Sequence, residues 1–154
     1  MKTALIILFF LLSIFSIYFI ILGIHSKSKT APGLINGHLS KCPDTPNCVC
    51  SEIKDHVGHY IAPITLAQNT LPTLEPLLRL KDIVKNMGGN IQVENKDYLA
   101  ATFTSTIFRF VDDLEIRIDR NKSLIHLRSA SRVGRSDLGI NKKRIELLKQ
   151  HYKK

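Results

Sequence analysis

Three cysteines and two histidines gather in one short stretch of the chain: Cys42, Cys48, Cys50, His56 and His59. Cys42 and Cys48 are separated by a segment with two prolines, and this spacing can close a small disulfide loop. The pairing is expected if the domain lies outside the cytoplasm. Cys50 would then be a free thiol or the alternative partner.

The same stretch allows two other kinds of chemistry. Cys48, Cys50, His56 and His59 are four ligands of the types that zinc binds, although zinc sites usually pair Cys-x-x-Cys with a second, distant pair. Cys48 or Cys50 could instead act as a nucleophile with His59 as its base, but no Asp or Asn that would orient the base is apparent. A structural disulfide loop remains the leading interpretation, and no metal is favoured.

A second candidate site lies near the C-terminus and contains Arg128, Arg132, Arg135, Ser136 and Asn141. Arg128 falls on a predicted strand. Arg132, Arg135 and Ser136 fall in a glycine-containing loop that leads into the last helix. A loop that enters a helix N-terminus presents unpaired N–H groups and the positive end of a dipole, which suits an anion. Arginines beside it would strengthen binding through bidentate pairing.

The alternative is that Asp137 pairs with Arg132 or Arg135 and only fixes the strand-to-helix corner. Charge favours an anionic partner, because residues 120–154 hold 11 of the 22 Lys and Arg residues but 2 of the 13 Asp and Glu residues. A solvated basic helix face would give the same count. Nucleic acid is not expected, because the phenylalanines at 103, 108 and 110 stand beside acidic residues.

The first 25 residues predict the membrane as a partner. Residues 4–24 carry no charge, and a helix of this length spans roughly 30 Å, the thickness of a bilayer core. A cleaved signal peptide usually has a shorter apolar run and a small-x-small site, and Ser26-Lys27-Ser28 is a poor one. We therefore expect a retained transmembrane anchor over residues 1–25, a linker over 26–40 and a globular domain over 41–154.

The elements that must position these sites are two helices and a run of strands. The first helix is predicted from Thr73, a good N-cap, with Pro76 in its first turn and a glycine pair ending it. Its apolar stripe is Leu74, Leu77, Leu78, Ile83, Val84 and Met87. The last helix is predicted to use Asn141 as N-cap, with Ile140 and Ile145 as a hydrophobic staple.

Between the helices the hydrophobic period changes to two, which is typical of strands. Strands are predicted over residues 91–94, 98–107, 113–119 and 124–131, after a short extended piece over 60–64 that ends against Pro63. Leu99, Ala101, Phe103 and Ile107 share one face. The strict alternation of 113–119 predicts a strand with one side in water. The fold class is α+β: an antiparallel four- to five-stranded sheet with two helices packed on one face, preceded by one transmembrane helix.

Three motifs, at residues 42–49, 59–63 and 128–141, together resemble the family catalogued as domain of unknown function 1499. The resemblance implies a bacterial or chloroplast-type protein, often with an N-terminal export or anchor segment, and it brings no assigned activity. Members usually have serine where this chain has Cys50. A pairing that uses Cys50 is therefore not supported by the family pattern.

The leading functional hypothesis is a non-enzymatic, membrane-anchored envelope domain without a cofactor. It would bind an anionic ligand, a lipid headgroup or a partner protein through the Arg128–Asn141 corner. The alternatives are a Cys/His enzyme or metal protein built on residues 42–59, and a scaffold protein. The flanking charges of the anchor are nearly balanced, so the expectation of an extracytoplasmic domain depends on the cysteines and the family resemblance.

Overall fold

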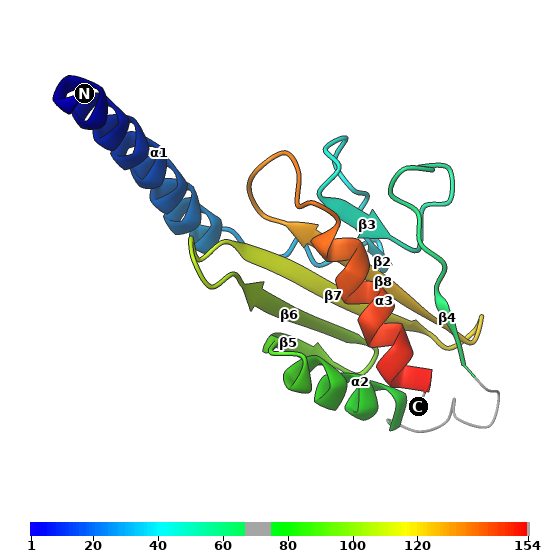
Figure 1. Cartoon of the computed structure of the whole chain (residues 1–154). Coiled ribbons are helices and arrows are strands. Elements are labelled where there is room, and N and C mark those ends of the chain that lie inside the picture. Colours follow the sequence, from blue (N-terminus) through cyan, green and yellow to red (C-terminus); the bar gives the residue numbers. More distant parts are fainter. Residues whose placement is uncertain (67–74, 154) are drawn as a thin grey trace.

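The computed structural model describes residues 1–66 and 75–153, and it shows an α+β domain from which a long N-terminal helix projects (Figure 1). The elements in chain order are α1 (Lys2–Ser28), β1 (Leu34–Ile35), β2 (His38–Leu39), β3 (Cys48–Cys50), β4 (Ile64–Thr65), α2 (Glu75–Asn86), β5 (Asn90–Asn95), β6 (Tyr98–Thr104), β7 (Val111–Asp119), β8 (Leu124–Ser131) and α3 (Ile140–Lys153). The predicted fold class is confirmed.

The main sheet is antiparallel and has the strand order β3-β8-β7-β6-β5. It has six strands rather than four or five, because two short segments pair with the same edge of β8. β3 pairs with residues 128–130 and β4 with residues 124–125. β4 starts after Pro63 instead of ending against it, since proline has no N–H for a strand ladder.

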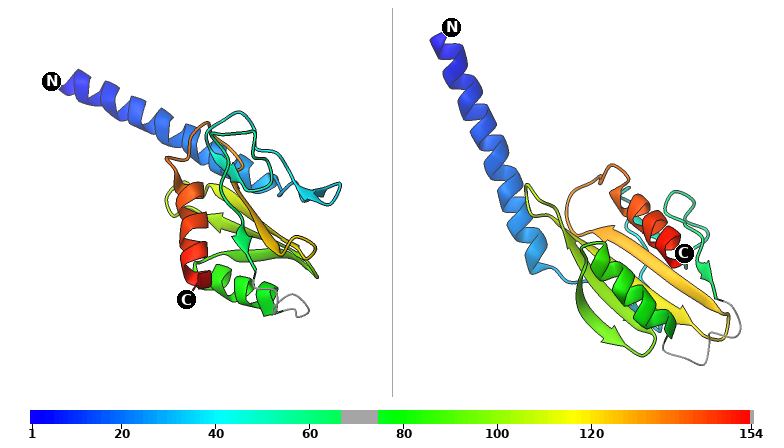
Figure 2. Two further views of the ribbon diagram at one scale, coloured as in Figure 1. Left: turned by 90° about the vertical axis from the view of Figure 1, so that its right-hand side faces the viewer. Right: turned by 60° about the horizontal axis from the view of Figure 1, so that its bottom comes forward.

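α2 and α3 cover one face of the sheet and bury the main hydrophobic core beneath them (Figure 2). Leu80, Val84, Ile145 and Leu148 are fully buried there. The predicted stripe of α2 was wrong at Leu78, which is 51% exposed, because the buried side of the helix passes through Leu80 instead. The predicted N-cap at position 73 and the leucine at 74 lie outside the described residues.

β7 runs through the middle of the sheet and is buried on both faces. Leu114 and Ile116 face the helices, whereas Asp113 and Glu115 alternate with them and point to the second face. The prediction that this second side lies in water is wrong, because Glu115 is 0% exposed and Asp113 is 4% exposed. Polar alternation marks the strand correctly but does not reveal what covers it.

The cover on the second face is the chain segment after α1. This segment contains the β1–β2 hairpin, although residues 26–40 read as a linker in the sequence (Figure 2). Leu39 and Cys42 pack with Tyr98, Ala100 and Ala130 in a second, smaller apolar cluster. The sheet is therefore enclosed by helices on one side and by an extended segment on the other.

The strand predicted over 98–107 ends at Thr104. Ile107 does not share the inward face of Leu99, Ala101 and Phe103, because the chain turns after Thr104 and leaves Ile107 83% exposed. The loop over residues 105–110, called the β6–β7 loop below, lies against the C-terminal end of α1 (Figure 1).

Candidate functional site

The end of α1 is in close contact with the β6–β7 loop. Gly23 is buried, and a Cβ atom there would overlap the carbonyl oxygen of Phe108. The ring centroid of Phe19 lies 5.0 Å from that of Phe108 and 6.0 Å from that of Phe110. Gly23 thus allows the backbones of the helix and the loop to come close together, and the aromatic rings pack beside that contact.

Polar contacts fix the same junction. The buried Ser26 Oγ accepts a hydrogen bond of 3.1 Å from the Val111 N–H. Arg132 binds both carboxylate oxygens of Asp113, at 2.9 and 2.7 Å, and also donates to the Ser26 carbonyl at 3.3 Å and to the Lys29 carbonyl. One arginine therefore joins β7 to the chain where α1 ends.

Between α1 and the domain lies a cavity of about 410 Å³, called the interface groove below. Tyr18, Phe19 and Leu22 of α1 form one wall. The opposite wall is the corner loop, residues 132–139, which joins β8 to α3, and it contributes Val133 and Leu138. This volume is within the range of ligand-binding sites, and the lining is mainly apolar.

Arg135 and Asp137 are polar residues of the groove wall with different surroundings. The Asp137 carboxylate accepts hydrogen bonds from the N–H groups of Gly139, at 3.1 Å, and Asn141, at 2.7 Å, so Asp137 caps α3. It does not pair with Arg132, whose carboxylate partner is Asp113. Arg135 is exposed and forms no ion pair with any described residue, which leaves its guanidinium able to meet an anion.

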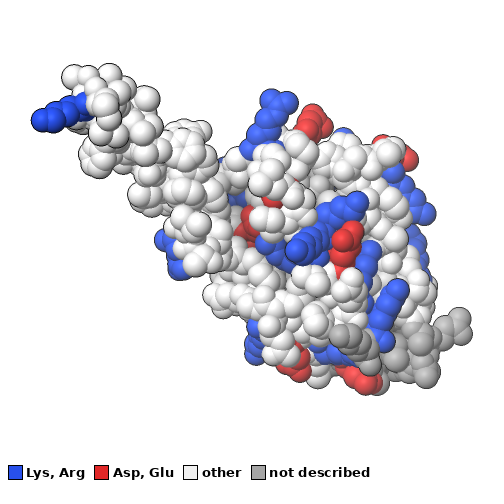
Figure 3. Space-filling model, viewed as in Figure 1, with Lys and Arg blue, Asp and Glu red and all other residues white. Residues whose placement is uncertain are grey.

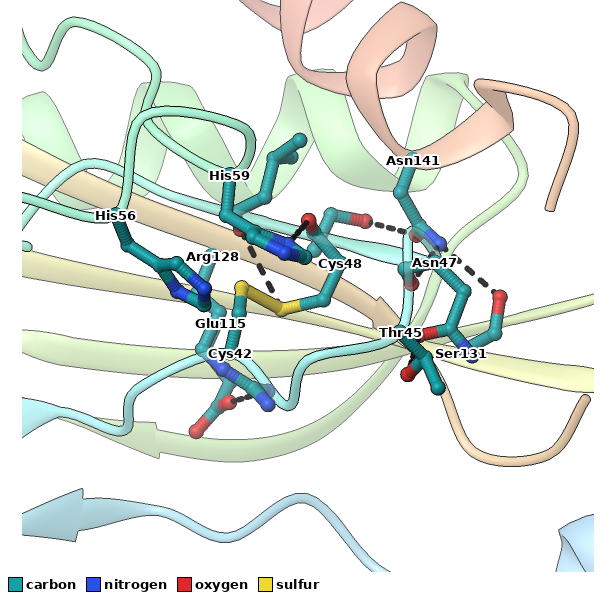
Figure 4. Close-up of a disulfide and its surroundings, with 12 residues drawn as sticks. Cys42, Thr45, Asn47, Cys48, His56, His59, Glu115, Arg128, Ser131 and Asn141 are labelled. Carbon is teal, nitrogen blue, oxygen red and sulfur yellow. Dashed lines mark hydrogen bonds and ion pairs between the residues drawn. A yellow bond between two sulfur atoms is a disulfide. The ribbon is translucent and has the colours of Figure 1, made fainter. Parts of the chain in front are cut away.

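Asn141 is a buried clamp inside α3 rather than its N-cap. Its Oδ1 accepts hydrogen bonds from Ser129, at 2.6 Å, and from Arg144, at 2.5 Å. Its Nδ2 donates to the Asn47 carbonyl at 2.9 Å and to Ser131 Oγ at 3.0 Å (Figure 4). These bonds tie together β8, α3 and the chain before β3, and they use the polar atoms of Asn141 within the fold.

The staple predicted with Asn141 as N-cap does not form, since Ile140 is 53% exposed while Ile145 is buried. Ser136 stands in the groove wall, and its Oγ accepts the N–H of Leu138 at 3.3 Å. Ser136 is exposed, so its hydroxyl remains accessible from the groove.

Arg128 lies away from the groove, on the second face of the sheet. Its Nη1 donates to Glu115 Oε2 at 2.8 Å, and Glu115 Oε1 accepts the Tyr98 hydroxyl at 2.8 Å and the Gly33 N–H at 3.1 Å. Burial raises the pKa of Glu115, against the opposing effect of the Arg128 charge. Burial also raises the pKa of Tyr98, and the neighbouring Glu115 raises it further.

The structure therefore does not bring the three candidate arginines together. Arg128 and Arg132 are each occupied by a buried carboxylate, and Arg135 is the one that faces the interface groove. Tyr18, Phe19 and Leu22 were not predicted as site residues. Nothing in the sequence near the corner loop indicates that side chains more than a hundred residues earlier complete the site.

The cysteine segment contains a disulfide, and its two histidines contact the protein around it. Cys42 and Cys48 form the predicted disulfide, and His59 Nδ1 lies 2.8 Å from the Cys48 carbonyl oxygen (Figure 4). The rings of His56 and His59 stack with centroids 4.0 Å apart. Cys50 is 2% exposed.

The surroundings of Cys50 do not resemble those of a reactive cysteine. Burial raises the pKa of the Cys50 thiol, whereas a nucleophilic cysteine needs a lowered pKa and access to its substrate. Within residues 1–66 and 75–153, no group of three or more His, Cys, Asp or Glu side chains could hold a metal ion.

Comparison with known families gives a match over most of the chain. Residues 38–151 match the family described as Protein of unknown function (DUF1499). The chain belongs to this family. The DUF1499 match spans the sheet, both covering helices and the corner loop, but α1 precedes it. No curated protein and no solved structure shows significant similarity to the chain.

Proposed function

We propose that this chain is a single-pass membrane protein of the cell envelope whose domain binds an anionic phospholipid in the interface groove. The observation that carries the proposal is the composition of the groove walls. One wall belongs to a helix long and apolar enough to span a membrane, and the other carries Arg135. A cavity built in this way opens where the helix leaves the bilayer.

The length and surface of α1 support anchoring. Its 27 residues correspond to roughly 40 Å of helix, enough for a bilayer core with its headgroup regions. Figure 3 shows a surface without charged side chains along most of the helix, whereas charges of both signs cover the domain. The Cys42–Cys48 disulfide favours an extracytoplasmic domain, because disulfides persist in oxidising compartments.

The chemistry of the groove fits an amphiphile with a phosphate. Apolar side chains of α1 and the corner loop would contact an acyl chain, and Arg135 would pair with the phosphate in bidentate geometry. Asp112 also lines the groove, but it pairs with Arg144 at 2.7 Å, which reduces its repulsion of an anion. The same groove would exclude a large hydrated ligand because of its size and lining.

The test is lipid retention by the full-length protein in a mild detergent, measured by native mass spectrometry after titration with phosphatidylglycerol or phosphatidylcholine. We expect tighter binding of phosphatidylglycerol. Arg135→Gln should weaken it about 10-fold or more, since a hydrogen bond to a charged group contributes roughly 1.5–3 kcal/mol. Lys85→Gln removes an exposed charge from the last turn of α2, which does not line the groove, and should leave binding unchanged.

A second variant tests the apolar wall. Leu22→Trp places a larger side chain at the groove and should reduce the retention of both lipids. Equal affinity of the wild type for the two lipids, together with no effect of Arg135→Gln, would overturn the proposal. Binding that requires a second protein would favour the partner-protein hypothesis instead.

A further inference from the structure

Two loops beside α1 end in apolar side chains that nothing in the domain covers. Ile107 in the β6–β7 loop is 83% exposed, and Leu138 in the corner loop is 92% exposed. Single exposed apolar residues are common on soluble proteins and need no explanation. These two differ because both of their loops lie against the helix that is apolar enough to cross a membrane.

The contacts with α1 set how far the loops extend along the helix. The β6–β7 loop reaches Phe19, and the groove wall that faces the corner loop includes Tyr18. Tyr18 precedes Ser28, the last residue of α1, by ten residues, which is roughly 15 Å of helix. The two loops thus run beside the final third of α1.

The loops run along enough of α1 to reach lipid if the helix spans a bilayer. α1 is about as long as the hydrocarbon core and both headgroup layers together, roughly 40–45 Å. Each headgroup layer is only about 5–8 Å thick by the same dimensions. Loops that accompany the final 15 Å of the helix therefore pass through one headgroup layer and reach the edge of the hydrocarbon.

The position of Arg109 is consistent with loop tips that reach the edge of the hydrocarbon. Arg109, next to the apolar tip of the β6–β7 loop, is exposed and has no ion pair within the described part of the chain. Its backbone is in the left-handed region, with φ of 59°, which is uncommon for a residue other than glycine. An arginine beside an inserted apolar tip can extend its guanidinium back to the phosphates while its stem stays in the apolar layer.

We infer that Ile107, Arg109 and Leu138 form a membrane-contact rim, which inserts its two apolar tips into the leaflet from which α1 emerges. The domain is then held in one posture on the bilayer by three attachments: the helix and two loops. This inference depends on α1 spanning a bilayer, as proposed above, but not on a lipid occupying the interface groove. Leu138 lines that groove but Ile107 does not, so the result at position 107 tests the rim separately from lipid binding in the groove.

The chain has no tryptophan, so single-tryptophan variants of the full-length protein report depth without background. Ile107→Trp and Leu138→Trp would be reconstituted into phosphatidylcholine vesicles, with and without brominated acyl chains. Leu78→Trp is the control, because Leu78 is 51% exposed and lies beside the β5–β6 turn, at the opposite end of β6 from the rim.

We expect the tryptophans at 107 and 138 to have blue-shifted emission and to lose most of their fluorescence with brominated lipid. The tryptophan at 78 should emit as in water and keep its intensity. Ile107 and Leu138 are exposed, so tryptophan can be placed at either position without disturbing the core. Circular dichroism of each variant verifies that the fold is retained. Emission and quenching at 107 and 138 equal to those at 78 would overturn the rim, whatever the groove binds.

Discussion

Replacing Arg128 with methionine tests the buried polar layer that holds the second face of the sheet. Arg128 is 6% exposed, and its carboxylate partner, Glu115, is 0% exposed. The substitution keeps the apolar stem but removes the guanidinium that donates to Glu115 at 2.8 Å. Glu115 would retain two neutral donors, the Tyr98 hydroxyl and the Gly33 N–H.

The expected loss is about 3–5 kcal/mol of unfolding free energy at neutral to mildly alkaline pH, the usual cost of leaving one member of a buried ion pair alone. The loss should depend on pH. Burial already raises the pKa of Glu115 above its ordinary value of 4.5, and removal of Arg128 raises it further. Above pH 4.5 the folded state then binds more protons than the unfolded chain, so stability falls as pH rises toward the raised folded pKa.

The penalty of Arg128→Met should therefore shrink on acidification, by at most about 1.4 kcal/mol per pH unit, because a protonated Glu115 carries no unpaired charge. Glu115→Gln is the matched comparison. It leaves the Arg128 guanidinium buried and ionised but removes the carboxyl that titrates, so its penalty, unlike that of Arg128→Met, should not shrink on acidification.

Urea unfolding of the full-length protein in mild detergent, followed by circular dichroism at several pH values, measures both penalties. Lys85→Met, on the exposed side of α2, controls for the loss of one positive charge. A penalty for Arg128→Met below about 1 kcal/mol, as for a surface ion pair, would refute the reasoning. A large penalty that did not change with pH would refute the role assigned to Glu115.

Three further predictions concern the fold, and each is measured by the same unfolding experiment. Leu80→Ala should cost about 2–5 kcal/mol, because Leu80 is 0% exposed, whereas Leu78→Ala on the outer side of α2 should cost less than about 1 kcal/mol; similar costs would contradict the assigned helix face. Replacing both Cys42 and Cys48 by serine should cost about 2 kcal/mol, as expected for so short a closed loop, and a reductant should then have no further effect. Burial lowers the pKa of His126 from 6.5, so below that pH the unfolded chain binds a proton that the folded state does not. The free energy of unfolding should therefore fall on acidification from pH 6.5. His126→Gln should reduce that fall, and an unchanged fall would contradict the assignment to His126.

The sequence predicted the parts of the fold that depend on local patterns. The change of period after the glycine pair separates α2 from the strands, and the alternation of residues 113–119 identifies β7. The wrong prediction for the second side of β7 has a clear physical cause. A polar side chain on a strand is exposed or buried according to what covers it, and Glu115 is buried by a partner 13 residues away and by the segment after α1.

The same limit applies to the candidate site. The sequence identified the arginines of the corner, but local pattern cannot show that Asp113 occupies Arg132 or that Asp137 caps α3. One wall of the interface groove comes from α1, a segment that composition alone marks only as an apolar helix. The role of each arginine depends on the pairing between strands and on the docking of the end of α1. The residues next to each arginine in the sequence predict neither.

The central claim is that α1 and the domain meet through Gly23, Phe19 and Phe108, so that the groove lies at the membrane surface. The most direct test places the photo-crosslinker p-benzoylphenylalanine at position 108 of the full-length protein in lipid vesicles. After irradiation, mass spectrometry should find position 108 joined to the α1 peptide that contains Phe19, since the two rings lie 5.0 Å apart. Adducts with lipid alone, and none with α1, would contradict the account.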